Sequence, residues 1–479
     1  MPKELPGFYY DAEKNRYFPL KGPIPGSSPK PPPMPPSSRT KQETTVLLRL
    51  THVDVCQSTK VRQEELLQAR ELFGKVISSR KGKVSMQAEY QKRHASKPTV
   101  WKYKGTKRMG NIALEHMIAD VTSPHGLIKR DILFTGGANG LLCLFQVGMA
   151  QQDIDPTQAY KADCIWPLNL DQAPTRKELL RHLGSSYGAT TYMSSDVSSI
   201  KASMSSSPAS DMLPKHFLIT TLGSGSAPGS VYLLDLTKPL DFDASVPMAR
   251  EGFYELASFR QTLWTADCGP GGRHAAIGTN RGVELLNMDT GASSRVLHCE
   301  IDVLSLQIDQ SGNFIISGLR NGAIMTVDSR QKPIKRSRNF QSKSMMPSSV
   351  CCLTSLKAWD QYFLASSMDG SIWLYDQRSL ERGPVQSYEG NVNSHTRIQL
   401  GVDPSEKVVL SGGEDCCVRL WDIKSGELLF KDRMMNSIPS AVCWPRNSDG
   451  QDCNRWYWEE HHLGAWLGSY DGITYMDWL

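Results

Sequence analysis

Apolar and polar residues alternate with a period of two along most of the chain beyond residue 100, in short segments separated by Gly, Asn, Asp and Ser. This alternation predicts half-buried β-strands joined by tight turns. One arrangement recurs seven times: a small or apolar stretch, a turn, and an alternating run that usually ends on an acid. The seven copies are residues 134–147, 217–236, 275–289, 314–330, 363–378, 408–424 and 464–478.

The spacing of the turn glycines indicates which architecture these copies build. Gly282, Gly322 and Gly370 lie 40 and 48 residues apart, and a four-stranded propeller blade occupies about 40 to 45 residues. Each blade packs between two neighbours, so the array must close into a ring to bury both of its ends. We therefore predict an all-β fold, a seven-bladed β-propeller over residues 99–479.

The last copy indicates how the ring closes. It ends at Leu479, directly after the third strand of its blade. The fourth strand must then come from the chain that precedes the first copy, where "TVWKYKG" (Thr99–Gly105) has the required alternation. We expect the two ends of the repeat array to pair within one blade.

The chain before the propeller divides into three parts. Residues 1–22 form an aromatic N-terminal motif, which either folds back onto the ring or captures a client or partner. Residues 23–48 are a proline-rich linker, expected to be extended because proline donates no backbone hydrogen bond. Residues 49–98 are predicted to be a partly helical segment.

One short amphipathic helix is predicted in that segment, over residues 62–73. It places Leu66, Ala69 and Phe73 on one face, and Gly74 is suited to end it. Such a helix either packs against the propeller or inserts into a groove of another protein.

Two insertions interrupt the repeat. Residues 194–211, "SSDVSSIKASMSSSPASD", are so small and polar that we expect a disordered surface loop. The second insertion contains "KPIKRSR" (Lys332–Arg338), which is either a nuclear-import patch or a solvated loop.

Composition excludes several classes of function. The 54 Lys+Arg and 49 Asp+Glu residues give a net charge of only +5, too small to indicate direct nucleic-acid binding. The 11 cysteines are odd in number and have no paired zinc spacing, which favours a reducing compartment, the nucleus or the cytoplasm. No run of eighteen apolar residues predicts a membrane span.

Signals for catalysis, cofactors or metals are poor. The glycine-rich "GSGSAPG" (223–229) precedes a strand, whereas a phosphate-binding loop leads into a helix. His461 and His462 have no third ligand at a suitable spacing, and no Ser or Cys lies in a nucleophile-elbow context. We expect no enzyme activity; a propeller hydrolase would require carboxylates converging at the mouth of the ring.

The sixth copy carries the first resemblance to a known family. "LSGGEDCCVRLWD" ends in Trp421-Asp422 and resembles a WD repeat, of which the other copies look like divergent forms. The resemblance implies a WD40 propeller. It also implies a hydrogen-bond chain inside the blade, for which Asp415, Ser411 and Trp421 fit the family pattern, whereas its histidine is missing.

A second resemblance concerns an arginine two residues after the closing acid. "YDQR" (375–378) is similar to the box by which WD proteins dock on the adaptor of the cullin 4 RING ubiquitin ligase, and "VDSR" (327–330) repeats it in the preceding copy. The alternative is a solvated arginine paired with its own aspartate. The adaptor-binding residues implied by the resemblance are Arg378, Arg330, Asp376, Tyr375 and Asp328.

The N-terminal motif carries a third resemblance. "LPGFYYDAEKNRYFPL" (5–20) is similar to the N-terminal signature of the damaged-DNA-binding and cullin-associated factor four family of WD substrate receptors. This family resemblance implies a non-catalytic receptor that binds the damaged-DNA-binding adaptor and the cullin 4 ligase and presents a client, whose identity the sequence leaves open. The alternative is a WD40 scaffold in a nuclear or cytosolic complex unrelated to ubiquitin.

Overall fold

The structure is a computed structural model that describes most of the propeller region and four short strands before it. The short strands are β1 (Phe8–Asp11), β2 (Arg16–Pro19), β3 (Ile77–Ser79) and β4 (Gly82–Val84). The other described residues are 94–123, 126–149, 159–167, 181–184, 189–204, 214–223, 227–242, 252–331, 344–445 and 463–478.

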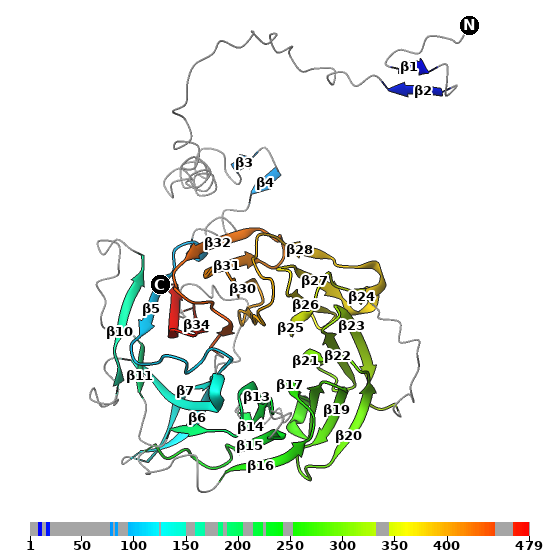
Figure 1. Cartoon of the computed structure of the whole chain (residues 1–479). Coiled ribbons are helices and arrows are strands. Elements are labelled where there is room, and N and C mark those ends of the chain that lie inside the picture. Colours follow the sequence, from blue (N-terminus) through cyan, green and yellow to red (C-terminus); the bar gives the residue numbers. More distant parts are fainter. Residues whose placement is uncertain are drawn as a thin grey trace, which may run out of the picture. The chain divides into compact units, whose positions relative to one another are not determined.

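Seven sheets follow one another around a ring, with their innermost strands toward its centre (Figure 1). This confirms the predicted seven-bladed propeller. In the first blade, the order from the centre outward is β6 (Ala113–Ser123), β7 (Gly126–Gly136), β8 (Leu141–Met149), β11 (Arg181–Gly184) and β9 (Ala159–Tyr160). The strand β12 (Thr190–Tyr192) also pairs with β8.

Blades 2 to 6 have four antiparallel strands each. Blade 2 contains β13 (Val197–Met204), β14 (Pro214–Thr221), β15 (Gly229–Asp235) and β16 (Phe253–Phe259). Blade 3 contains β17 (Leu263–Cys268), β18 (His274–Thr279), β19 (Gly282–Asn287) and β20 (Ser293–His298). Blade 4 contains β21 (Val303–Ile308), β22 (Phe314–Leu319), β23 (Ala323–Asp328) and β24 (Ser344–Met345).

The remaining blades come from the C-terminal part of the chain. Blade 5 contains β25 (Val350–Ser355), β26 (Tyr362–Ser367), β27 (Ile372–Asp376) and β28 (Gln386–Tyr388). Blade 6 contains β29 (Leu400–Val402), β30 (Val408–Gly412), β31 (Cys417–Asp422) and β32 (Leu428–Arg433). Blade 7 contains β33 (Ala441–Cys443), β34 (Leu463–Ser469) and β35 (Gly472–Trp478), followed outward by β5 (Thr99–Tyr103) and β10 (Ala162–Trp166).

Blade 7 confirms the predicted closure. The strand β5 pairs antiparallel with β35, with Val100 opposite Met476 and Trp101 opposite Tyr475. Val100 and Met476 are both fully buried and belong to one apolar cluster. The fifth strand, β10, which adds to the outer edge of β5, was not predicted from the repeat.

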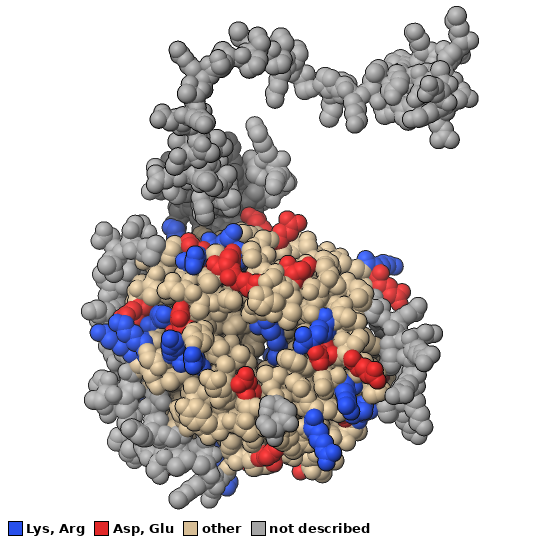
Figure 2. Space-filling view, viewed as in Figure 1, with Lys and Arg blue, Asp and Glu red and all other residues tan. Residues whose placement is uncertain are grey.

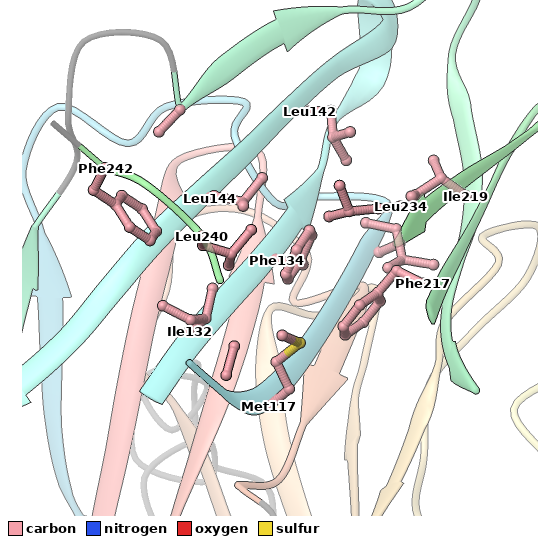
Figure 3. Packing of buried hydrophobic residues seen from close by; sticks show 14 of the residues in the cluster. Met117, Ile132, Phe134, Leu142, Leu144, Phe217, Ile219, Leu234, Leu240 and Phe242 are labelled. Carbon is pink, nitrogen blue, oxygen red and sulfur yellow. The ribbon is translucent and has the colours of Figure 1, made fainter. Parts of the chain in front are cut away.

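The neighbouring faces of blades 1 and 2 show how the blades pack. The Phe134 and Phe217 rings stack with their centroids 4.3 Å apart, and Met117, Ile132 and Leu234 surround them (Figure 3). All five side chains are nearly or fully buried. Alternating strand residues therefore supply the apolar layer between consecutive blades.

The N-terminal motif is partly described. Its strands β1 and β2 form an antiparallel hairpin in which Tyr9 lies opposite Phe18. The chain separates into two compact units, Met1–Gln68 and Ala69–Leu479, and this hairpin belongs to the first. In the segment predicted to be partly helical, β3 and β4 form a second small hairpin. The predicted helix over residues 62–73 lies outside the described residues.

The prediction of a disordered loop at 194–211 is wrong over residues 197–204. These residues are β13, the innermost strand of blade 2, with Val197 and Ile200 buried at its blade interface. The serines are tolerated because small side chains fit near the crowded centre and find partners there. The hydroxyls of Ser198 and Thr220, for example, lie 2.7 Å apart. Residues 205–211 lie outside the described part.

The structure also contradicts the hydrogen-bond chain that the WD resemblance implies for blade 6. Asp415 forms an ion pair with the fully buried Arg419, whose Nη1 donates to Asp415 Oδ1 over 2.9 Å. The Ser411 hydroxyl donates to the Gly412 carbonyl, and Trp421 Nε1 donates to the Glu389 carbonyl. Arg419 therefore pairs with Asp415 inside the blade, where the family pattern would place the missing histidine.

A carboxylate introduced into the closing strand should open the ring. We expect Val100→Asp to lower the free energy of unfolding by about 3 to 5 kcal/mol, because it buries an unpaired charge. Denaturant unfolding measures the change. Leu127→Asp is the matched control, since Leu127 is 66% exposed. An unchanged midpoint for Val100→Asp would contradict the closure.

The Asp415–Arg419 pair should make stability depend on pH. Burial alone would raise the pKa of Asp415, but the hydrogen bonds and charge of Arg419 lower it to about 2. Because this pKa is below the unfolded value, the stabilisation is present above pH 4 and is lost as the pH falls toward 2.

We expect this aspartate to account for about 2 kcal/mol of the stability lost between pH 6 and pH 2. Urea titrations at successive pH values should therefore show a shallower acid loss in Asp415→Asn than in the unchanged protein. Asp360→Asn, at an exposed aspartate, is the control. Identical pH profiles for Asp415→Asn and the unchanged protein would disprove the coupling.

Candidate functional site

The chain makes the same compact turn after the third strands of blades 4 and 5. After β23, Asp328 Oδ1 accepts hydrogen bonds from the backbone N–H of Arg330 (3.0 Å) and from its Nε (2.9 Å). Asp328 Oδ2 accepts from Arg330 Nη2 over 2.8 Å. The aspartate thus fixes both the turn and the direction of the guanidinium that follows it.

Blade 5 repeats this geometry after β27. Asp376 Oδ1 accepts from the backbone N–H of Arg378 (2.9 Å) and from its Nε (3.0 Å), and Oδ2 accepts from Nη2 (2.8 Å). Blade 6 departs from it, because Lys424 replaces the arginine and Asp422 accepts from the backbone N–H of Ser425. Only a guanidinium offers the planar fork that this bidentate pairing requires.

Both arginines present their outer side to solvent. The side chains of Arg330 and Arg378 are 62% and 69% exposed, whereas those of Asp328 and Asp376 are 13% and 15% exposed. Exposed pairs of this kind contribute little to stability. The hydrogen bond from Arg330 lowers the pKa of Asp328 to about 2, and Arg378 lowers the pKa of Asp376 in the same way, so both aspartates stay ionised near neutral pH.

The pairing with an adjacent aspartate, considered above as the alternative to a binding role, is thus present. It is compatible with that role because each guanidinium retains unused donors. Among the described residues, Nη1 of Arg330 and Nη1 of Arg378 make no hydrogen bond. The aspartates therefore orient the two arginines while leaving one edge of each free.

Exposed aromatic side chains lie at the same end of blades 4 and 5 as the two arginines. The Arg330 guanidinium lies 5.9 Å from the centroid of the Phe314 ring, and Phe314 is 40% exposed. Trp359 is 58% exposed in the loop between β25 and β26, which Gln377 holds through its hydrogen bond to the Asp360 carbonyl. Neither aromatic was predicted from the sequence, where a tryptophan within the polar loop "KAWDQ" was the available signal.

The loops on this side of blades 4, 5 and 6 are joined to one another. Gln310 Nε2 donates to the Lys357 carbonyl over 2.7 Å, and the Ala358 N–H donates to Glu406 Oε2 over 2.9 Å. The C-terminal ends of the first and third strands of a blade lie at the same end because successive strands are antiparallel. We call this surface the docking face and define it by Arg330, Arg378, Phe314 and Trp359.

Tyr375 does not belong to the exposed surface. Its side chain is fully buried and stacks on Phe363, with ring centroids 5.4 Å apart. It can therefore support the turn at Asp376 only from inside the blade. The helix residues Leu66, Ala69 and Phe73, the pair His461–His462 and the segment 332–338 lie outside the described residues.

Positive and negative side chains are interspersed on the face shown in Figure 2, with no large area of one sign. In the described ranges, no group of three or more His, Cys, Asp or Glu side chains is arranged to hold a metal ion. No helix among the described residues has the length and apolar character needed to span a membrane.

Comparison with known proteins identifies the family. Residues 189–448, which contain blades 2 to 6 and the docking face, match the model of the DDB1- and CUL4-associated factor 4 beta-propeller domain. The chain belongs to this family. The match confirms the family that the sequence predicted.

Individual members of the factor 4 family are distant in sequence. DDB1- and CUL4-associated factor 4 of Bos taurus is 24% identical over 452 residues, which are 89% of this chain and 78% of the relative. The human protein of the same name is 27% identical over 233 residues, 48% of this chain and 44% of the relative. Human DDB1- and CUL4-associated factor 4-like protein 2 is 28% identical over 245 residues, 48% of this chain and 58% of the relative.

Proposed function

We propose that the protein is a non-catalytic substrate receptor of a cullin 4 RING E3 ubiquitin ligase. The docking face binds the DDB1 adaptor, and the receptor presents a client protein for ubiquitination by the cullin-bound machinery. The observation that carries the proposal is the repeated turn in which Asp328 and Asp376 aim the exposed Arg330 and Arg378. The names of the factor 4 relatives, which include DDB1 and CUL4, support it.

The geometry of the arginines suits a protein interface. Each guanidinium is held in one orientation before binding, so less side-chain freedom is lost when a partner carbonyl or carboxylate meets it. Exposed aromatic surface beside an arginine is the usual composition of an interface hot spot, and Phe314 provides it beside Arg330. Trp359 adds exposed aromatic surface at the same end of blade 5. A rim of joined loops keeps the contacts in fixed relative positions.

The proposal assigns the chemistry of ubiquitin transfer to the ligase and only binding to this chain. It also locates the protein where the ligase works, in the nucleus or the cytoplasm. The contribution of the helix at 62–73 to adaptor binding stays a prediction.

Loss of one docking arginine should weaken adaptor binding without unfolding the ring. Truncating an arginine that is buried in an interface costs about 2 to 5 kcal/mol, so Arg378→Ala should reduce DDB1 affinity about thirtyfold or more. We expect a similar or smaller effect for Arg330→Ala. Arg378→Lys should lose most of the same affinity, because lysine keeps the charge but lacks the fork.

Binding titrations with purified DDB1, run beside thermal melts, provide the measurement. Arg260→Ala is the matched control, because Arg260 is exposed and follows the fourth strand of blade 2, at the opposite end of the blades. If the Arg330→Ala, Arg378→Ala double variant is folded and binds DDB1 with unchanged affinity, the receptor mechanism is wrong. If neither DDB1 nor cullin 4 is recovered with the full chain when it is purified from cells, the alternative of an unrelated WD40 scaffold is favoured.

A further inference from the structure

A second arginine site lies at the centre of the ring, on the face opposite the docking face. Arg397 lies three residues before β29 of blade 6, and its Nη1 donates to the carbonyls of Ser198 (3.2 Å) and Trp264 (2.6 Å). Those two residues lie near the N-terminal ends of β13 and β17, the innermost strands of blades 2 and 3. One side chain therefore reaches across the centre of the ring.

The direction of the strands fixes the face to which this site belongs. Ser198 and Trp264 lie near the beginnings of first strands, whereas Arg330 and Arg378 follow the ends of third strands. First and third strands of a blade run in the same direction, because each is antiparallel to the second. The arginine at the centre and the docking arginines consequently lie at opposite ends of the blades.

The positive charge of Arg397 is not compensated by the part of the chain that the structure describes. No carboxylate among the described residues forms an ion pair with it, and its Nη2 and its buried Nε make no hydrogen bond there. Burial lowers the pKa of Arg397, because a charged group loses hydration without gaining an opposite charge. An anion that meets the guanidinium would restore this lost stabilisation.

A second guanidinium completes the site. Arg320 lies over the Trp264 ring, with its Cζ 5.1 Å from the ring centroid, and pairs with Asp302. The Nε1 of Trp264 is buried without an acceptor among the described residues. We define Arg397, Trp264 and Arg320 as the central mouth. Asp302 matches the charge of Arg320, so the charge of Arg397 is the one that no ion pair compensates within the central mouth.

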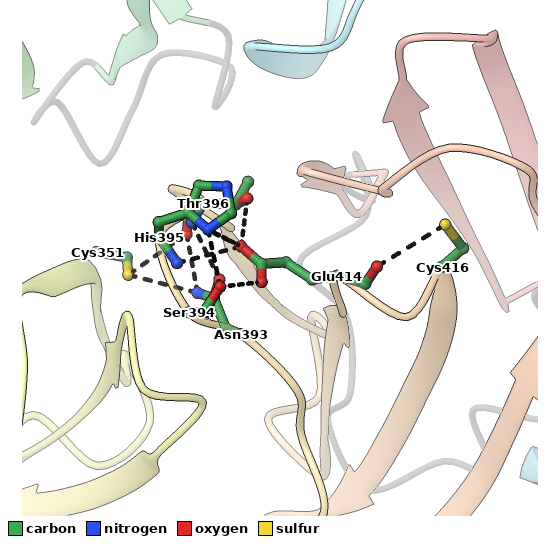
Figure 4. Close-up of polar contacts among 7 residues, drawn as sticks. All are labelled: Cys351, Asn393, Ser394, His395, Thr396, Glu414 and Cys416. Atoms are coloured by element: carbon green, nitrogen blue, oxygen red, sulfur yellow. Dashed lines mark hydrogen bonds and ion pairs between the residues drawn. The ribbon is translucent and has the colours of Figure 1, made fainter.

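The loop that carries Arg397 is held rigidly. Glu414 accepts hydrogen bonds from the Ser394 hydroxyl (2.5 Å), the His395 N–H (3.1 Å) and the Thr396 N–H (3.0 Å), as Figure 4 shows. Asn393 Nδ2 also donates to the Thr396 carbonyl over 2.8 Å. Arg397 thus starts from a fixed backbone, which reduces the cost of ordering it around a ligand.

We propose that the central mouth binds a carboxylate of a client peptide. A carboxylate has one negative charge and two acceptor oxygens, which match the uncompensated charge and the unused donors of Arg397. A phosphate, with a charge near −2, would leave excess negative charge at this site. The inference rests on the proposed receptor function: the client occupies one end of the ring while the adaptor occupies the other.

The test uses the full-length chain and three fluorescent hexapeptides at about 0.15 M salt, where contacts between distant exposed charges are largely screened. Amidated hexaglutamate presents side-chain carboxylates, hexaglutamine with a free C-terminus presents only the terminal one, and amidated hexaglutamine presents none. We expect one or both carboxylate peptides to bind and the neutral peptide not to bind. Binding of hexaglutamine only when its C-terminus is free would identify the chain terminus as the ligand.

Variants of the arginines test whether this binding is at the central mouth. Arg397→Met should weaken carboxylate binding at least about tenfold, the effect typical of losing a charge-assisted hydrogen bond. Arg397→Lys keeps the charge and a donor to the backbone carbonyls, so it should fold normally. It should still bind the carboxylate peptides more weakly than the unchanged protein, because lysine lacks the planar fork of donors. Arg281→Met removes an exposed arginine from the turn before β19 and serves as the matched control.

Unchanged carboxylate affinity in folded Arg397→Lys and Arg397→Met would overturn the inference, as would tighter binding of the corresponding phosphoserine hexapeptide. DDB1 titrations of the same variants keep the two proposals apart. Arg397→Met should retain DDB1 affinity, whereas Arg378→Ala should retain carboxylate affinity. If Arg378→Ala keeps its DDB1 affinity, the receptor proposal has failed, whereas if Arg397→Met keeps its carboxylate affinity, the inference about the central mouth has failed.

Discussion

The pairing of β5 with β35 is the constraint on which the rest of the structure depends. Each blade needs a neighbour on both sides to bury its two faces, and only a closed ring provides that for the first and last blades. The closure joins Val100 to Met476 across almost the whole propeller sequence. Loop-closure entropy grows only with the logarithm of loop length, so one well-packed strand pair is sufficient to hold this contact.

The closed ring has two different surfaces because the strands of each blade alternate in direction. The ends of the third strands of blades 4 and 5 are followed by Arg330 and Arg378, and the beginnings of two first strands, β13 and β17, contact Arg397. Contacts between blades, such as the bond from Gln310 to Lys357 on the docking face, keep each surface in register. In the function proposed above, this arrangement would hold the adaptor and the client at opposite ends of the ring.

Arginine has three different roles in this propeller, and its surroundings decide which one applies. Arg419 is fully buried and neutralised by Asp415, so its role is structural. Arg378 is paired with Asp376 but exposed, so its guanidinium has a fixed orientation toward solvent. Arg397 is bound to backbone carbonyls without a carboxylate in the described residues, which leaves its charge available. Burial and counter-charge therefore decide whether an arginine here is structural or keeps donors for the binding roles proposed above.

The sequence by itself determined the seven blades, the closing strand and the positions of Arg330 and Arg378 after third strands. These features depend on alternation and turn spacing, which involve residues close together in the chain. The tertiary structure decided what depends on distant residues. Residues 197–204 look disordered by composition, yet they form a strand because pairing with β14 places Thr220 beside Ser198 and the ring brings the Ala266 carbonyl of blade 3 to Ser199. Arg397 contacts carbonyls 199 and 133 residues away, and contacts of that separation leave no periodic signal in the sequence.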